Sequence, residues 1–145
     1  MVNNINKKAV KENMMKRTHI AVGVAITAPI ILNMNLPIVA GLGIIGAIAP
    51  DWDFYIGLEH RTLTHSLFAL LVTTMPIYLF DSSLGFIWGV TYLSHILLDS
   101  LTVMGVPFLY PFIKERRRFM KFRTGDGEDY FIQLIAIYLT VMNFV

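Results

Sequence analysis

The chain has 145 residues, of which 55% are hydrophobic and only 15% are charged, and its mean hydropathy is +0.60. This composition excludes an ordinary soluble domain and is typical of a small membrane protein with several apolar segments. The chain contains no cysteine, so it has neither a disulfide nor a thiolate metal ligand. Any metal would have to bind histidine nitrogen and carboxylate oxygen.

The formal net charge of +2 hides an uneven distribution of basic residues. Five of the twelve Lys and Arg residues lie in residues 1–17, six lie in residues 114–123, and the remaining one is Arg61. Basic segments beside apolar runs are typical of topology signals or of contacts with anionic lipid. This pattern favours membrane lipid as a partner and argues against a nucleic acid, and it leaves a homo-oligomer open.

Five apolar runs follow the basic amino-terminal segment. We expect residues 1–17 to form a basic cytoplasmic extension and residues 18–145 a single membrane-embedded helical domain, since no repeat or second domain is visible. The runs are residues 20–32, 36–49, 63–80, 84–101 and 130–145. The first two are shorter than the roughly 20 residues of a spanning helix, so they cross a thinned bilayer or form a re-entrant hairpin. The sequence therefore predicts an all-α, polytopic membrane bundle of about five apolar helices.

The positive-inside rule orients these runs, and both basic segments are then cytoplasmic. Counting from a cytoplasmic amino terminus places residues 51–62 and 114–129 inside, and it places residues 81–83 outside. Small residues in the second run suit close packing between helices, and they are Gly41, Gly43, Gly46 and Ala47. We expect a multi-pass membrane protein in which the ends of four helices meet at one inner boundary.

Titratable side chains gather at that boundary, most densely in residues 51–66. Ionisable residues at membrane depth commonly mark functional sites. The predicted metal ligands comprise all four histidines of the chain and three aspartates: His19, Asp51, Asp53, His60, His65, His95 and Asp99.

The spacing of these residues allows pairs of ligands. His95 and Asp99 are four residues apart, so on a helix they share one face with Cβ atoms about 5–6 Å apart. Asp51 and Asp53 can both turn toward one cation from a loop. The alternative for His95 and Asp99 is a hydrogen bond to a metal ligand or a buried pair. For Asp51 and Asp53 it is helix capping or plain solvation.

His60 and His65 are five residues apart, a spacing that separates them on a regular helix. They could bind together if His60 lies in a loop and His65 lies in the first turn of a helix capped by Thr62 or Thr64. Taken singly, each histidine also suits the lipid headgroup level.

Imidazole and carboxylate are ligands of zinc, manganese and iron. Seven candidate ligands exceed the needs of one tetrahedral ion, so we expect one or two divalent transition-metal ions. Two-metal sites commonly hold a phosphoryl group. Glu59 is the predicted general base, or a solvated acid, and Arg61 could bind a phosphate oxygen or extend to lipid headgroups.

Four short segments together resemble a known family. They are Thr18-His19 and residues 50–53 (PDWD), 60–66 (HRTLTHS) and 94–99 (SHILLD). In this combination the chain is similar to the YdjM-type inner-membrane metal-dependent hydrolases, a family distantly similar to zinc-dependent phospholipase C. The resemblance covers about residues 15–125. It implies an inner-membrane protein with a metal site, zinc before manganese or iron, made from these histidines and aspartates.

The expected function is therefore hydrolysis of a phospholipid or lipid-linked phosphoester at the cytoplasmic boundary of the membrane. The alternative is a non-catalytic metal-binding membrane protein with a structural, stress-response or partner-binding role. A metal transporter fits less well, because it would place polar groups near the middle of the bilayer.

Overall fold

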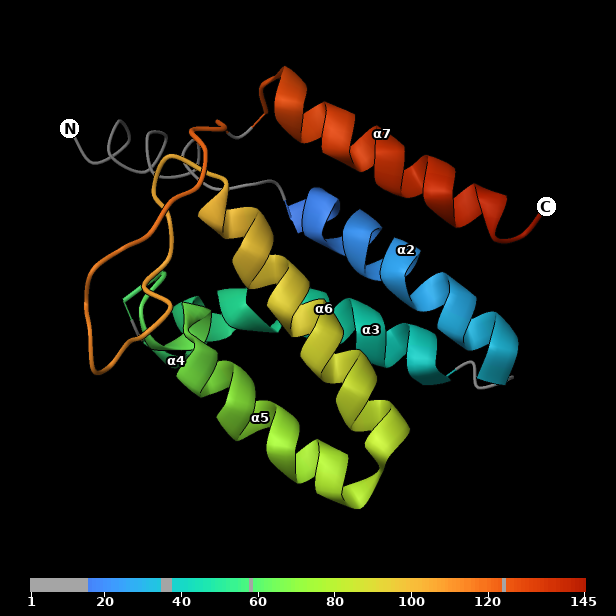
Figure 1. The fold of residues 1–145 in the computed structure, drawn as a ribbon, viewed down its shortest axis with the longest axis horizontal. Coiled ribbons are helices and arrows are strands. Elements are labelled where there is room, and N and C mark those ends of the chain that lie inside the picture. The colour runs from blue at the N-terminus through green and yellow to red at the C-terminus, as the bar shows by residue number, and fades with distance from the viewer. Residues whose placement is uncertain (1–15, 35–37, 58, 124) are drawn as a thin grey trace.

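The computed structural model describes residues 16–34, 38–57, 59–123 and 125–145. Within them the chain forms five helices of 11 to 19 residues, with short helical turns between them (Figure 1). The long helices are α2 (Lys16–Met34), α3 (Ile38–Ile48), α5 (Leu67–Phe80), α6 (Ser82–Ser100) and α7 (Gly127–Met142). The short ones are η1 (Ala49–Trp52), α4 (Asp53–Ile56) and η2 (Leu63–His65). The described residues pair as β structure only in two isolated bridges, so the all-α prediction is confirmed.

Helix α6 is the centre of the fold, because α2, α3 and α5 all pack against it, while α7 packs against α2. Its buried side chains Trp88, Tyr92 and Ile96 form one core with Ala49 and Val106. Burial of these large apolar groups is the main stabilising contribution to the packing around α6.

Two glycines let α3 approach its neighbours closely. A Cβ at Gly46 would lie 2.3 Å from the Thr91 hydroxyl on α6, and one at Gly43 would lie 2.4 Å from a Thr27 methyl group on α2. At Gly41 the same construction meets no heavy atom within 4 Å. The predicted close packing is thus found at Gly43 and Gly46 and not at Gly41.

Helix α5 begins after a capping serine. The Ser66 hydroxyl accepts a hydrogen bond from the Ala69 backbone N–H at 3.1 Å. The predicted cap at Thr62 or Thr64 is not found, because Thr62 precedes η2 without a side-chain capping hydrogen bond. The Thr64 hydroxyl donates to Asp53 at 3.2 Å, which connects the turn before α5 to the first residue of α4.

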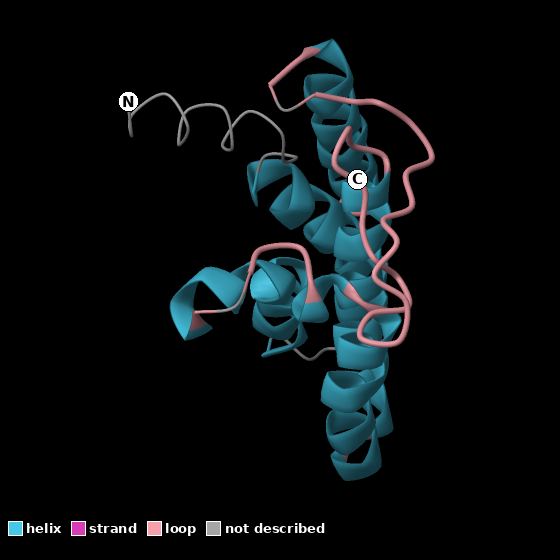
Figure 2. Cartoon of the chain, turned by 90° about the vertical axis from the view of Figure 1, so that its left-hand side faces the viewer, coloured by secondary structure: helices cyan, strands magenta, loops and turns pink. Residues whose placement is uncertain are grey.

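Successive long helices run in alternating directions. The first residues of α2 and α5 and the last residues of α3 and α6 therefore lie toward the same end, on the left in Figure 1. Figure 2, viewed from that end, shows the long connection between α6 and α7 as a loop beside these helix ends. Bridges from Thr102 to Phe122 and from Val106 to Arg117 hold this connection together. The expected gathering of helix ends is present.

The length and composition of the helices bear on the predicted membrane crossings. Helices α3, α5 and α7 have 11, 14 and 16 residues. No helix in the described ranges is both long and apolar enough to cross a membrane. Of the predicted cytoplasmic extension, residues 1–15 lie outside the described residues, and Lys16 and Arg17 begin α2.

Candidate metal centre

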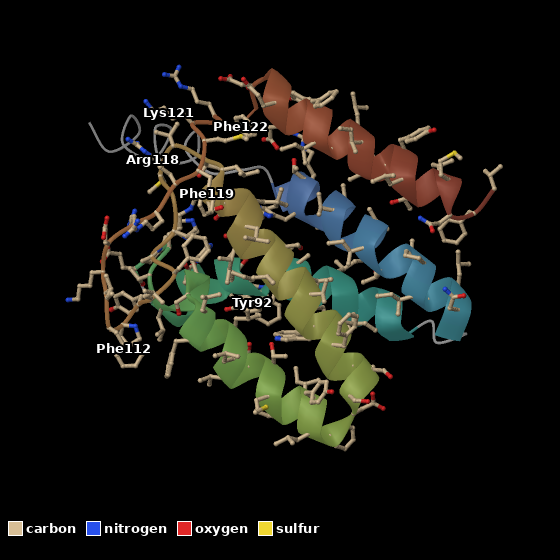
Figure 3. All side chains as sticks on the ribbon, viewed as in Figure 1. Tyr92, Phe112, Arg118, Phe119, Lys121 and Phe122 are labelled. Atoms are coloured by element: carbon tan, nitrogen blue, oxygen red, sulfur yellow. The ribbon has the colours of Figure 1, made fainter. Side chains whose placement is uncertain are left out.

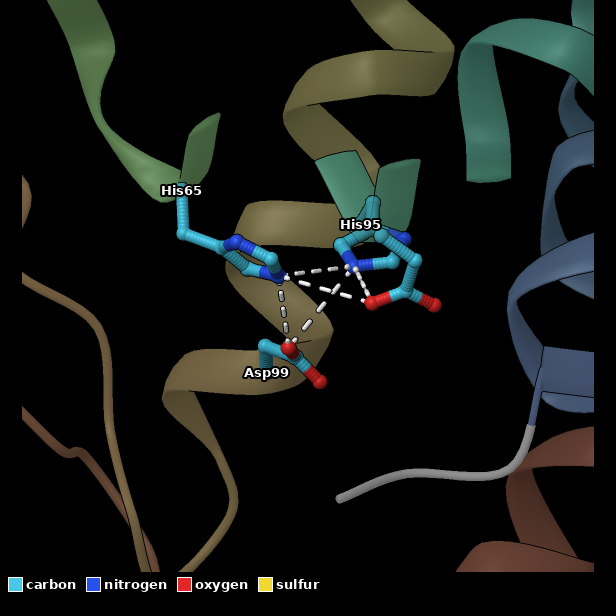
Figure 4. Close-up of side chains that lie close together, drawn as sticks. His65, His95 and Asp99 are labelled. Atoms are coloured by element: carbon cyan, nitrogen blue, oxygen red, sulfur yellow. Dashed lines mark hydrogen bonds and ion pairs between the residues drawn. The ribbon is translucent and has the colours of Figure 1, made fainter. Parts of the chain in front are cut away.

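Four of the seven predicted ligands meet at one buried point. Asp51 lies in η1 after α3, His65 in η2 before α5, and His95 and Asp99 one turn apart on α6. One ligand atom of each lies within 4.8 Å of those of the other three, and all four residues are buried. Figure 4 shows His65, His95 and Asp99 turned toward one another.

The distances within this four-residue group match those between the ligands of one ion. The His65 Nε2 atom lies 3.3 Å from both His95 Nε2 and Asp99 Oδ2. The Asp51 Oδ1 atom lies 3.7 Å from His65 Nε2 and 3.6 Å from His95 Nε2, and Asp99 Oδ2 lies 3.7 Å from His95 Nε2. Bonds of about 2.1 Å in a tetrahedron put ligand atoms about 3.4 Å apart. The group could therefore hold a metal ion.

Each histidine of the group is oriented through its other ring nitrogen. The Nδ1 atom of His95 lies 2.7 Å from the Ala47 carbonyl oxygen, which can only accept, so Nδ1 carries a proton and Nε2 is the nitrogen that faces the other three residues. The Nδ1 atom of His65 lies 3.1 Å from the Thr64 hydroxyl and 3.7 Å from Asp53. Such contacts fix ring orientation and raise the basicity of a metal-binding nitrogen.

The Asp99 carboxylate connects the four-residue group to Arg61 and His19. Its Oδ2 atom faces His65 and His95, whereas its Oδ1 atom lies 2.7 Å from Arg61 Nη2 and 3.4 Å from His19 Nε2. The His19 ring also stacks on His95, with ring centroids 3.8 Å apart. His19 therefore supports two members of the group from α2.

Arg61 is fully buried and held from several sides. Its guanidinium donates to the Thr102 hydroxyl at 2.7 Å and to the Gly105 carbonyl at 3.4 Å, besides its contact with Asp99. Its backbone φ of 58° lies in the left-handed region, which costs a non-glycine residue free energy. Burial lowers the pKa of Arg61 and the Asp99 charge opposes this shift. An arginine remains a cation under such conditions, so it neutralises the buried Asp99 carboxylate.

Asp53 and His60 form a second group that shares His65 with the first. The His60 Nδ1 atom lies 2.9 Å from Asp53 Oδ2. The backbone N–H of Arg61 donates to the same oxygen at 3.2 Å. A separation of 2.9 Å is a hydrogen-bond distance, shorter than the spacing within the first group. Asp53, His60 and His65 also form a group that could hold an ion, although here a hydrogen bond joins His60 to Asp53.

The loop carboxylates are held in their ionised form. Burial alone would raise the pKa of Asp51, but the neighbouring His65 and His95 rings outweigh it and keep this pKa below its ordinary value. The pKa of Asp53 is also lowered, because the hydrogen bond and charge of His60, the His65 ring and the Arg61 backbone N–H together outweigh the effect of burial. Ionised carboxylates are the form that binds a cation.

The two predicted catalytic residues lie differently from one another. Arg61 is buried and paired with Asp99. Glu59 is exposed, with its carboxylate 3.9 Å from Arg116 Nη2. Both residues line a cavity of about 210 Å³ together with Lys114 and Arg116. The sequence reasoning treated Lys114 and Arg116 as topology signals, and no spacing rule would have placed them beside Glu59.

Partners contributed by backbone and hydroxyl groups were also missed. The Ala47 carbonyl and Thr102 hydroxyl carry no recognisable pattern in the sequence, since they act through tertiary proximity. Their contacts with His95 and Arg61 are nevertheless among the shortest at the site, at 2.7 Å each.

These features define an all-helical protein with a buried histidine and aspartate group able to hold a metal ion. The sequence matches the family described as YdjM inner membrane protein over residues 14–144, which include all seven predicted ligands. The chain therefore belongs to this inner membrane protein family.

Two relatives are similar over about half of the chain. Both are from Methanothermobacter thermautotrophicus and are described as uncharacterized proteins ORF4 and ORF4'. They are 35% and 37% identical over 71 residues, which cover 48% of this chain and 29% and 30% of the relatives. The match thus spans less than a third of the length of either relative. No solved structure matches the chain.

Proposed function

We propose that the protein is a metal-dependent hydrolase of the inner membrane that acts on a phospholipid or lipid-linked phosphoester at the cytoplasmic headgroup boundary. The observation that supports this most is the buried, closely spaced group of Asp51, His65, His95 and Asp99, joined through Arg61 to a cavity with basic walls. Exposed apolar side chains on the outer helices would face lipid, and the amino terminus would be cytoplasmic.

The donor set fits a divalent transition metal, because it combines two imidazole nitrogens with two ionised carboxylates. Such a metal, when bound, supplies a Lewis acid for a phosphoryl oxygen and lowers the pKa of coordinated water. Zinc is our first choice, and manganese or iron would accept the same donors. We assign one ion to the four-residue group and leave Asp53 and His60 the role of orienting His65.

The chain's own residues have separable roles in this proposal. Arg61 holds the Asp99 carboxylate in place, and Glu59 at the edge of the cavity accepts a proton from the attacking water. Hydrolysis forms a bond from the water oxygen to phosphorus and breaks the ester P–O bond. The leaving alcohol oxygen takes up one proton, so the products are a phosphate and an alcohol.

A second candidate function is a structural metal site without catalysis. It is favoured by the burial of all four ligands, since four protein ligands close a tetrahedral ion and leave no position for water. Asp51, whose side chain is 11% exposed, is the least buried of the four and is the point where a fifth ligand could enter.

Cobalt substitution separates the two functions. The visible spectrum of Co²⁺ bound to purified wild-type protein should change when orthophosphate or a short-chain phospholipid is added, if the ion has an open position. The same preparation should then release phosphate or alcohol from a phospholipid panel, and Asp51→Asn should not. A spectrum unchanged by anions, together with no hydrolysis with zinc, manganese or iron, would favour the structural site.

A further inference from the structure

The cavity beside the metal centre has an unusual set of walls. It has a volume of about 210 Å³, and Glu59, Arg61, Thr62, Tyr110, Lys114 and Arg116 contribute to its lining. Three of these side chains are cationic and one is anionic. The cavity lies between the loop before η2 and the connection that follows α6, two segments 40 or more residues apart.

The cations of the cavity are only partly neutralised. Arg61 is paired with Asp99, and Arg116 has only a loose contact of 3.9 Å with the exposed Glu59 carboxylate. In the described part of the chain the Lys114 ammonium forms no ion pair. An excess of positive charge in a concave site attracts an anion.

The surroundings of the cavity distinguish between kinds of anion. Its volume is below the roughly 300 Å³ at which pockets for drug-sized ligands begin, so it suits a phosphate with a small headgroup and not a whole lipid. Exposed apolar side chains, Phe112 and Ile113, directly precede Lys114. Figure 3 shows Phe112 at the outer edge of this segment, with Arg118 and Lys121 further along it. Apolar and basic side chains interleaved in this way suit a lipid surface.

We propose that this cavity binds the phosphate group of a phospholipid, with Lys114 and Arg116 as its charged donors. Arg61 lines the cavity and lies 2.7 Å from Asp99, so it links the bound phosphate to the metal centre. The proposal deepens the proposed hydrolase by naming where its substrate binds, and it rests on that function for its biological meaning. Binding itself can be measured without any reaction.

The experiment compares two double variants that remove the same charge from the same segment. Lys114→Gln with Arg116→Gln changes the cavity, whereas Arg117→Gln with Lys121→Gln changes residues that do not line it. Full-length protein in neutral detergent, with its metal content measured, is titrated with orthophosphate and with dihexanoyl phosphatidic acid. Calorimetry at about 0.15 M salt limits long-range effects of charge, because screening acts over roughly 8 Å.

We expect the cavity variant to weaken binding of both ligands about tenfold or more, as loss of charge-assisted hydrogen bonds should. The control variant should change binding less than about threefold, and metal content should be equal in both. Equal weakening of binding by both variants, or no weakening by either, overturns the proposal that this cavity binds phosphate. Phosphatidic acid should bind more tightly than orthophosphate. If it does not, the phosphate site stands and its assignment to lipid is overturned.

The same preparations separate failure of the cavity from failure of the hydrolase. Phosphate binding that depends on Lys114 and Arg116, with no hydrolysis of any phosphoester, supports the cavity and contradicts the hydrolase. Hydrolysis by wild type that the cavity variant retains with unchanged KM contradicts the cavity alone. Binding that Lys114→Arg retains and Lys114→Gln loses would support a requirement for charge at this position.

Discussion

Replacing His95 by alanine should remove one of the four ligand atoms of the metal centre and most of its affinity for metal. The His95 Nε2 atom lies 3.3–3.7 Å from the ligand atoms of His65, Asp51 and Asp99, so it contributes one corner of the tetrahedron. Zinc bound by four protein ligands is worth on the order of 12 kcal/mol, and a quarter of this is about 3 kcal/mol. Affinity should fall by roughly two orders of magnitude.

The assay is elemental mass spectrometry on detergent-purified protein after titration with zinc, manganese and iron. His60→Ala is the matched control, because His60 belongs to the neighbouring group and has no atom in the four-residue group. The His60→Ala variant should keep the ion of the four-residue group. If wild type binds two ions and this variant binds one, a second ion binds at Asp53 and His60. Circular dichroism reports whether each variant keeps its helices, and Asp51→Asn repeats the test at the least buried ligand.

Two results would refute this reasoning. The first is a His95→Ala variant that binds metal with wild-type affinity and stoichiometry. The second is a folded wild type that binds none of the three metals at micromolar concentration. The cluster would then be a hydrogen-bonded network that stabilises the junction of helices.

Three further predictions concern stability. Gly46→Ala should lower the free energy of unfolding by about 1–3 kcal/mol in a denaturation titration, because the new Cβ would overlap the Thr91 hydroxyl. Gly41→Ala, in open space, should be neutral or stabilising. Equal effects of the two substitutions would contradict the packing of α3 on α6. Arg61→Gln should lower the free energy of unfolding of metal-free protein by about 3 kcal/mol, because it removes the cation paired with the buried Asp99 carboxylate. The loss should be smaller with metal bound, and an equal loss in both forms would count against a metal at Asp99. Chelation of metal should lower the thermal midpoint, since a ligand at 1,000 times its Kd adds about 4 kcal/mol of stability; an unchanged midpoint in metal-depleted protein would count against a bound ion.

The gathering of polar residues could be predicted because it depends on chain order. Apolar helices joined by short turns alternate in direction, so residues at alternate turns meet at one end. Asp51 follows the second run, His65 introduces the third, and His95 with Asp99 closes the fourth. The helical spacing of His95 and Asp99 then placed both on one face of α6. Their convergence in the structure follows from these two regularities.

The individual roles of the polar residues could not be predicted in this way. Asp53 and His60 have the same residue types as the four-residue group, yet they lie 2.9 Å apart as a hydrogen-bonded pair. Their separation from the four depends on the backbone of the loop, where Arg61 adopts a left-handed conformation. A spacing in sequence does not contain that information, because a loop has no fixed periodicity.

The sequence by itself determined the helical class, the metal-binding chemistry of the donors and the end of the fold at which they meet, because composition and periodicity carry these properties. Only the tertiary structure decided which four side chains share one point and that Arg61 is buried against Asp99. It also decided that Lys114 and Arg116 share a cavity with Glu59. Those contacts join residues far apart in the chain, and they form only when packing around α6 brings the segments together.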